Sequence, residues 1–112
     1  MPLGRDYTVL DLIARLRCEV IVVARNELGT LNHTLLTVRA LRSTRAALHA
    51  IVLMQPRVPD PSSSSNPRLL SRLLRPTPVL TLPWLGPACN RPNLLRAKAS
   101  DLKSSLAKVL RN

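Results

Sequence analysis

The stretch that decides the fold runs from residue 18 to residue 35 and reads CEVIVVARNELGTLNHTL. Its first part, Cys18 to Ala24, is dense in β-branched residues and does not alternate with polar ones. Such a run is typical of a strand covered on both faces, as in a parallel sheet. Gly29 can adopt the backbone angles of a tight turn. Thr30 is a favourable N-cap for a helix to about Ser43, so the stretch predicts a strand, a turn and a helix.

The segments that follow extend this unit into a sheet. A second apolar run, His49 to Met54, completes a strand–helix–strand unit, which is expected to be parallel with a right-handed crossover. A short helix is predicted from Asn66, as N-cap, to Arg75, and a third strand over Pro78 to Leu82. The predicted fold class is therefore α/β, a partial parallel sheet with flanking helices in one domain over residues 1–112.

Two further helices and two irregular segments complete the prediction. The helices are expected over Thr8–Leu16 and Ser100–Leu110, and the irregular segments over Gln55–Pro67, which is rich in Pro and Ser, and Gly86–Leu95. Thr8 and Asp11 have the spacing of a capping box at the start of the first helix. The last helix is amphipathic and carries Leu102, Leu106, Val109 and Leu110 on one face.

The charge of the chain is strongly positive. Seventeen Lys and Arg residues stand against six Asp and Glu residues, which gives a formal net charge of +11. The cations are dotted between apolar residues, and with one Trp, one Tyr and no Phe there is no aromatic platform on which bases could stack. A high positive charge favours nucleic-acid binding when the cations are clustered. Because they are dispersed here, the composition argues against a dedicated nucleic-acid-binding protein.

The cysteines and the apolar runs indicate the cellular compartment of the protein. Cys18 and Cys89 could form at most one disulfide, and Cys18 opens an apolar run, where a buried reduced thiol is usual. The longest aliphatic stretch, Val20–Ala24, is too short to cross a membrane, and Met1–Tyr7 has no apolar core of a signal peptide. A soluble cytoplasmic protein is expected, with no metal site, because the two histidines stand apart from other ligands.

Three loops are candidate ligand sites because they leave the carboxyl ends of the predicted strands. In open α/β sheets ligands bind at this edge. The loops are Arg25–Asn32, Met54–Pro59 and Leu82–Gly86. The first leads into a helix N-terminus, where free backbone N–H groups and the helix dipole favour a phosphate or a carboxylate.

Two blocks of sequence resemble the dethiobiotin synthetase family. Residues 28–37 read LGTLNHTLLT directly after the apolar strand, and the family has Leu-Gly-x-Ile/Leu-Asn-His-x-Leu-Leu-Thr at that place. Residues 78–86 read PVLTLPWLG, which is similar to a later family segment, and Pro2-Leu3 matches its lead-in. The resemblance covers roughly the first three quarters of the chain.

The resemblance implies an activity and a set of binding residues. Dethiobiotin synthetases are homodimeric P-loop enzymes that condense diaminopelargonate with carbon dioxide, using ATP and Mg²⁺, to close a ureido ring in biotin synthesis. It implies that the substrate carboxylate is held across the dimer interface by the backbone of Gly29, Thr30, Leu31 and Asn32. It implies that the adenine is bordered by Met54, Gln55, Leu82, Pro83 and Trp84. Met54 and Gln55 stand where an Asn-Asp or similar pair often reads the base, which leaves the nucleotide preference open.

The larger departure from the family is the phosphate-binding motif. The sequence contains no G-x-x-x-x-G-K-[ST] and no acidic Gly-rich motif for Mg²⁺, and its three lysines, Lys98, Lys103 and Lys108, all lie in the last helical region. These parts supply most of the charge stabilisation in phosphoryl chemistry. The chain is therefore interpreted as the C-terminal half of a dethiobiotin synthetase, a P-loop NTPase-like three-layer α/β/α fold without its P-loop half. No catalytic or metal-binding residue is assigned, and the chain is expected to be inactive without a missing half.

Two alternatives stay open. One is another P-loop amidoligase of the cobyrinate-amidating type, for which a glutaminase Cys/His pair would be expected, and the sequence has no supporting pattern for it. The other is a non-catalytic basic remnant or a nucleic-acid-binding protein.

Overall fold

The structure, a computed structural model, describes residues 2–87 and 90–110. In chain order its elements are β1 (Pro2–Gly4), β2 (Tyr7–Thr8), α1 (Val9–Leu16), β3 (Glu19–Arg25), α2 (Thr30–Arg42), β4 (Ala47–Met54), α3 (Asn66–Leu73), β5 (Val79–Leu82) and α4 (Pro92–Leu110).

The main sheet has the strand order β3–β4–β5, and both pairs of strands are parallel. The predicted α/β class and its three strands are thereby confirmed. The register aligns the carboxyl ends, because Arg25 lies opposite Met54 and Met54 lies opposite Leu82. The loops that leave the three strands therefore begin at one edge of the sheet.

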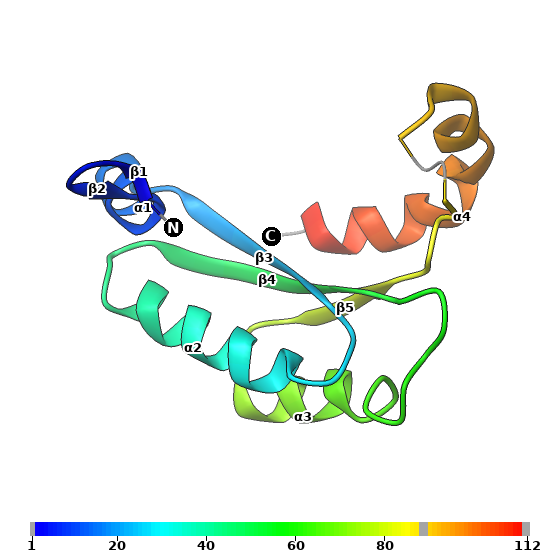
Figure 1. Ribbon diagram of the computed structural model, residues 1–112, viewed down its shortest axis with the longest axis horizontal. Helices are drawn as coiled ribbons and strands as arrows, with labels where there is room; N and C mark the ends of the chain where they lie inside the picture. Colours follow the sequence, from blue (N-terminus) through cyan, green and yellow to red (C-terminus); the bar gives the residue numbers. More distant parts are fainter. Residues whose placement is uncertain (1, 88–89, 111–112) are drawn as a thin grey trace.

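Helices cover the two faces of this sheet unequally. Figure 1 shows α2 and α3 on one face and α4 on the other. The first face holds a core cluster of buried aliphatic residues, Val38, Ile51, Leu53, Leu70 and Leu74. The second holds a smaller cluster, Val52, Leu82, Leu102 and Val109. The three layers thus enclose most of β4 and β5.

Strand β3 differs from the prediction, which expected cover on both faces. Val22 and Ala24 pack against the first core cluster, but Ile21 and Val23 on the opposite face are 39% and 63% exposed. The expectation was wrong because α4 packs on residues of β4 and β5 and does not bury the same face of β3. Among the described residues, the apolar run of β3 is therefore covered on the face of Val22 and Ala24 and exposed on the face of Ile21 and Val23.

The N-terminal segment confirms the predicted capping box. The Asp11 carboxylate accepts a hydrogen bond from the Thr8 backbone N–H (2.7 Å), and the Thr8 hydroxyl accepts one from the Asp11 backbone N–H (3.2 Å). The Thr8 side chain is also the main cause that lowers the pKa of Asp11. The β1–β2 hairpin before this helix was not predicted, because strands of two and three residues carry no readable periodicity.

Two predicted N-caps are shifted by one residue. The N-cap of α2 is Gly29, with φ at +93°, and Thr30 is the first helical residue, whose hydroxyl donates to the Arg25 carbonyl instead. The N-cap of α3 is Ser65, and Asn66 lies inside the helix, with its side chain used elsewhere. In both cases the polar side chain that the local pattern assigned to the helix end bonds elsewhere, to the Arg25 carbonyl for Thr30 and to Asn26 and Glu27 for Asn66.

Helix α4 is longer than predicted. It begins at Pro92, so the segment expected to be irregular to Leu95 is helical in its last residues. Proline suits a helix start because its missing N–H would have no partner there. Leu102 and Val109 are buried as predicted, whereas Leu106 is 44% exposed, and the Leu110 side chain lies outside the described residues. His49 on β4 fixes the helix end, with its Nε2 2.7 Å from the Val109 carbonyl oxygen.

Candidate functional site

The three loops singled out from the sequence meet at the carboxyl edge of the sheet. The hydrogen-bond ladder continues past the strand ends, since the Asn26 N–H donates to the Met54 carbonyl (2.9 Å) and the Gln55 N–H donates to the Leu82 carbonyl (2.8 Å). These two hydrogen bonds fix the start of the loop after β3 to the end of β4, and the start of the loop after β4 to the end of β5. This is the edge at which open α/β sheets bind ligands.

A hollow of about 400 Å³ opens at this edge, and residues from all three loops line it. The lining residues are Arg25, Glu27, Met54, Gln55, Pro56, Arg57, Trp84, Leu85 and Gly86. The structure thus brings together Met54, Gln55 and Trp84 of the predicted base-binding set. Leu82 does not line the hollow, because it is buried in the second core cluster, and Pro83 lines a neighbouring hollow with Gln55 and Trp84.

Charged side chains accompany the aromatic wall of this hollow. The guanidinium carbon of Arg57 lies 5.8 Å from the centre of the Trp84 ring, which is cation–π distance. Trp84 is 43% exposed. Arg25 and Glu27 add one positive and one negative charge from the β3 side. Sequence reasoning assigned no role to these three charged residues, because nothing local distinguishes them from other surface charges.

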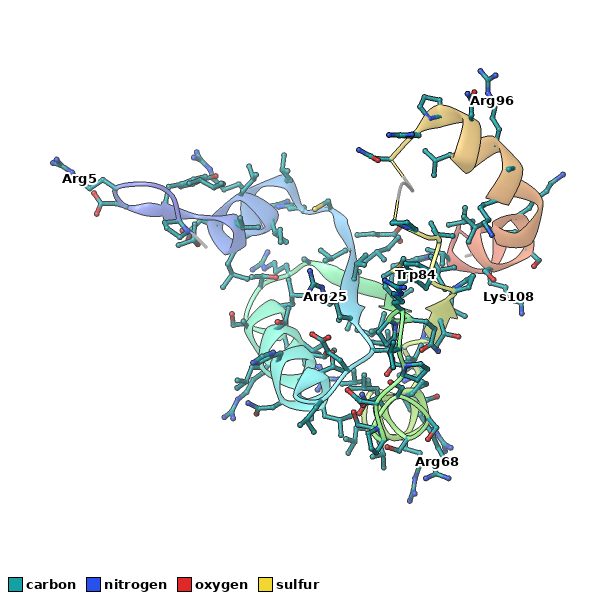
Figure 2. All side chains as sticks on the ribbon, turned by 45° about the vertical axis from the view of Figure 1, so that its right-hand side comes forward. Arg5, Arg25, Arg68, Trp84, Arg96 and Lys108 are labelled. Atoms are coloured by element: carbon teal, nitrogen blue, oxygen red, sulfur yellow. The ribbon has the colours of Figure 1, made fainter. Side chains whose placement is uncertain are left out.

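The remaining positive charge is spread over the molecule. Figure 2 shows Arg25 and Trp84 near its middle, whereas Arg5, Arg68, Arg96 and Lys108 project from its periphery, with Arg68 on α3 and both Arg96 and Lys108 on α4. A dispersed arrangement of this kind does not form the continuous basic stripe that follows a nucleic-acid backbone.

A buried asparagine stands behind the hollow. Asn26 is fully buried, and its Nδ2 donates to Gln55 Oε1 (3.0 Å) and to the Ser63 carbonyl (2.7 Å). Its Oδ1 accepts from Asn66 Nδ2 (3.1 Å). All three partners come from the segment after β4. One side chain after β3 therefore fixes the loop that carries the predicted base-reading residue, and sequence reasoning missed it.

Further hydrogen bonds join the same two loops. The Ser63 hydroxyl donates to the Asn26 carbonyl (2.9 Å), and Asn66 Nδ2 also donates to the Glu27 carbonyl (3.1 Å). The Asp60 carboxylate accepts from the Leu28 N–H (2.8 Å). Hydrogen bonding to Asp60, first from the Ser62 hydroxyl and then from the Leu28 N–H, lowers the pKa of this carboxyl. The Pro- and Ser-rich segment is therefore held in place although residues 55–65 contain no helix or strand.

The predicted carboxylate site lies beside the hollow and not within its lining. Gly29 and Thr30 open α2, and the Thr30 N–H already donates to the Glu27 carbonyl (3.1 Å). The next two backbone N–H groups, of Leu31 and Asn32, have no helical partner, as is usual in a first turn. Among the four predicted residues, Leu31 and Asn32 therefore offer backbone donors to an anion.

Two further observations concern metals and membranes. Within residues 2–87 and 90–110, no group of three or more His, Cys, Asp or Glu side chains is arranged to hold a metal ion. No helix in the same part is both long enough and apolar enough to span a bilayer.

Comparisons with known proteins identify a matching family model and several similar enzymes. A family model described as an AAA domain matches residues 1–92. The ATP-dependent dethiobiotin synthetase of Anaeromyxobacter sp. (strain Fw109-5) is 40% identical over 99 residues, 88% of this chain and 44% of that protein. The enzyme of the same name from Haloferax mediterranei is 41% identical over 86 residues, 77% of this chain and 37% of that protein. The one from Bacillus subtilis (strain 168) is 39% identical over 74 residues, 65% of this chain and 32% of that protein.

The chain thus spans less than half the length of the curated relatives it matches. No solved structure matches it.

Proposed function

Since the chain belongs to the AAA domain family, we propose that it forms the base-binding and substrate-carboxylate part of a dethiobiotin synthetase and serves biotin synthesis. The names of its relatives support this function, as they are described as ATP-dependent dethiobiotin synthetases. The proposed substrate is diaminopelargonate, and the proposed nucleotide is a nucleoside triphosphate.

One observation carries the proposal. Met54 and Gln55 at the end of β4 and Trp84 after β5 line one hollow at the carboxyl edge of a parallel sheet. An indole ring and a thioether are suited to the flat aromatic face of a nucleobase, and a carboxamide can form hydrogen bonds with the polar edge of the base. Arg25 and Arg57 line the same hollow and supply positive charge for an anionic ligand.

The substrate carboxylate is assigned to the start of α2. This helix has 13 residues, and the free N–H groups of Leu31 and Asn32 lie in its first turn. Leu28, which precedes this turn, is among the most exposed large apolar residues of the chain. That exposure supports the proposal that a second subunit of a homodimer completes this site.

We assign the binding of the nucleotide phosphates and of Mg²⁺ to a polypeptide segment outside this sequence. ATP bound together with Mg²⁺ would supply the phosphoryl group that drives closure of the ureido ring. The sequence has no phosphate-binding loop of the form G-x-x-x-x-G-K-[ST], and its described residues hold no group of three or more His, Cys, Asp or Glu side chains placed to bind a metal ion. The residues of this chain would bind and orient the base and the substrate carboxylate, and no chemical step is assigned to them.

Nucleotide binding to the hollow can be measured directly, because Trp84 is the single tryptophan of the chain. Titration with nucleoside triphosphates at millimolar concentration should quench or shift its fluorescence in a saturable way. The Gln55→Ala variant should bind about 2- to 10-fold more weakly, as expected for one lost hydrogen bond. Arg96→Ala, at a distant position on α4, is the control and should bind as the original chain does. Failure of every nucleotide to change the fluorescence would overturn the proposal.

A further inference from the structure

We propose that Asn26 is a positioning residue for nucleotide binding, because it holds the Gln55 side chain at the wall of the hollow before a ligand arrives. This inference rests on the proposed function, in which Gln55 is one of the side chains that contact the nucleotide. Asn26 is not among the residues that line the hollow. It therefore acts on the ligand only through Gln55.

Every polar group of Asn26 has a partner. Its backbone N–H donates to the Met54 carbonyl (2.9 Å), and its backbone carbonyl accepts from the Ser63 hydroxyl (2.9 Å). Its Nδ2 donates to Gln55 Oε1 (3.0 Å) and to the Ser63 carbonyl (2.7 Å). Its Oδ1 accepts from Asn66 Nδ2 (3.1 Å). Because the residue is fully buried, no water can replace a partner that is lost, and Asn26 has one favourable position.

Two backbone carbonyls fix the orientation of the buried amides. A carbonyl only accepts hydrogen bonds. The Ser63 carbonyl therefore requires the N–H₂ group of Asn26, and the Glu27 carbonyl, 3.1 Å from Asn66 Nδ2, requires the N–H₂ group of Asn66. Asn26 thus presents a donor to Gln55 in a direction that the surrounding main chain determines.

Gln55 has a long side chain that would be mobile without this bond. Its backbone is fixed, since its N–H donates to the Leu82 carbonyl (2.8 Å). Its side chain is half-buried and lines the hollow. Ordering a flexible side chain when a ligand binds weakens the binding by about 2- to 10-fold. The hydrogen bond from Asn26 orders Gln55 when the chain folds, so that this loss does not fall on the binding step.

Asn66 offers a matched comparison within the same network. It is also a buried asparagine, and its Nδ2 donates to Asn26 Oδ1 and to the Glu27 carbonyl. In the part of the chain that the structure describes, no hydrogen bond joins it to Gln55. Removing the Asn66 side chain therefore loosens the same loops but leaves the bond from Asn26 to Gln55 in place.

The test measures ATP binding to the full chain by the fluorescence of Trp84. Asn26→Ala should weaken ATP binding by about 2- to 10-fold, whereas Asn66→Ala should change it by less than about 2-fold. In the Gln55→Ala background, Asn26→Ala should have no further effect, because there is no longer a side chain to hold. Far-ultraviolet circular dichroism at the temperature of the titration establishes that each variant is folded.

The outcomes separate positioning from a general structural role. A structural role would make Asn26→Ala weaken ATP binding equally with and without the Gln55 side chain, or make Asn66→Ala weaken it as much as Asn26→Ala. Either result, or an unchanged affinity in folded Asn26→Ala, would overturn the inference and leave the proposed function intact. Failure of the original chain to respond to any nucleotide would overturn both.

A second measurement uses the original chain and does not depend on a folded variant. Nitrogen-15 relaxation of the Gln55 side-chain N–H₂ group, without nucleotide, reports how far this group is ordered. An order parameter near that of rigid backbone, about 0.85, is expected. A value below about 0.6, which is typical of a flexible group, would show that Asn26 does not hold Gln55 and would overturn the inference.

Discussion

Replacing Asn26 with alanine should destabilise the chain more than any other polar substitution in its described part. The side chain is fully buried and makes three hydrogen bonds, to Gln55, Ser63 and Asn66. All three connect the β3–α2 loop to a segment 29 to 40 residues further along the chain. The substitution therefore removes the link between two loops and does not merely enlarge a cavity.

The magnitude can be worked out bond by bond. The Ser63 carbonyl belongs to a buried residue and would be left without its donor, which costs about 1–3 kcal/mol. The bonds to Gln55 and Asn66 contribute about 1 kcal/mol each. The free energy of unfolding should thus fall by about 3–5 kcal/mol. With an unfolding entropy of about 2.1 cal/mol/K per residue over 112 residues, the Tm should fall by roughly 13–21 °C.

Thermal and urea unfolding followed by circular dichroism measure this loss. Asn93→Ala is the matched control, because Asn93 is exposed in the first turn of α4, and it should change the stability by no more than about 0.5 kcal/mol. If Asn26→Ala melted within about 2 °C of the original chain, the loop after β4 would not depend on Asn26. The positioning of Gln55 by Asn26 would then lose its basis as well.

Four other outcomes follow from the structure. Gly29→Ala should cost about 1–2 kcal/mol, because residue 29 has φ of +93°, whereas Gly4→Ala, which meets no atom within 4 Å, should be near neutral in the same melting assay. Leu102→Ala should lose about 2–5 kcal/mol in urea unfolding, because Leu102 is buried, and Leu106→Ala, which is 44% exposed, should lose far less. Side-chain hydrogen bonding lowers the pKa of Asp60, so its contribution to stability is present above its unfolded pKa and is lost as the pH falls through the lower folded pKa. Asp60→Asn should flatten that part of the stability profile. Finally, the purified chain should not hydrolyse ATP in the presence of Mg²⁺, and Mg²⁺-dependent phosphate release would contradict the proposed division of the enzyme.

The sheet could be predicted from the sequence because its strands carry strong local signals. The apolar runs that form β3 and β4 are separated by a helix, and Val38 and Leu41 of that helix are buried. A strand–helix–strand pattern of this kind leaves few topologies. The short strands β1 and β2 were missed because they show no periodicity, and the starts of α2, α3 and α4 were shifted.

The candidate site was predictable only where its residues lie at or just after the end of a strand. Met54 ends β4, Gln55 follows it and Trp84 lies two residues after β5, and the topology alone places such residues at one edge. The role of Asn26 depends instead on partners 29, 37 and 40 residues away, and that of Arg57 on the ring of Trp84. No local pattern encodes such contacts, because they arise from how two irregular loops pack.

The one marked disagreement between sequence and structure bears on the proposed function. The run from Val20 to Ala24 is apolar at every position, yet Ile21 and Val23 lie on a face that α4 does not reach. A strand that is buried on one side only does not require apolar residues on both sides. The pattern is instead that of a strand inside a larger sheet with helices on both faces. Because the matched relatives are more than twice as long as the aligned region, this unsatisfied face supports the proposal that the chain works together with further polypeptide that covers it.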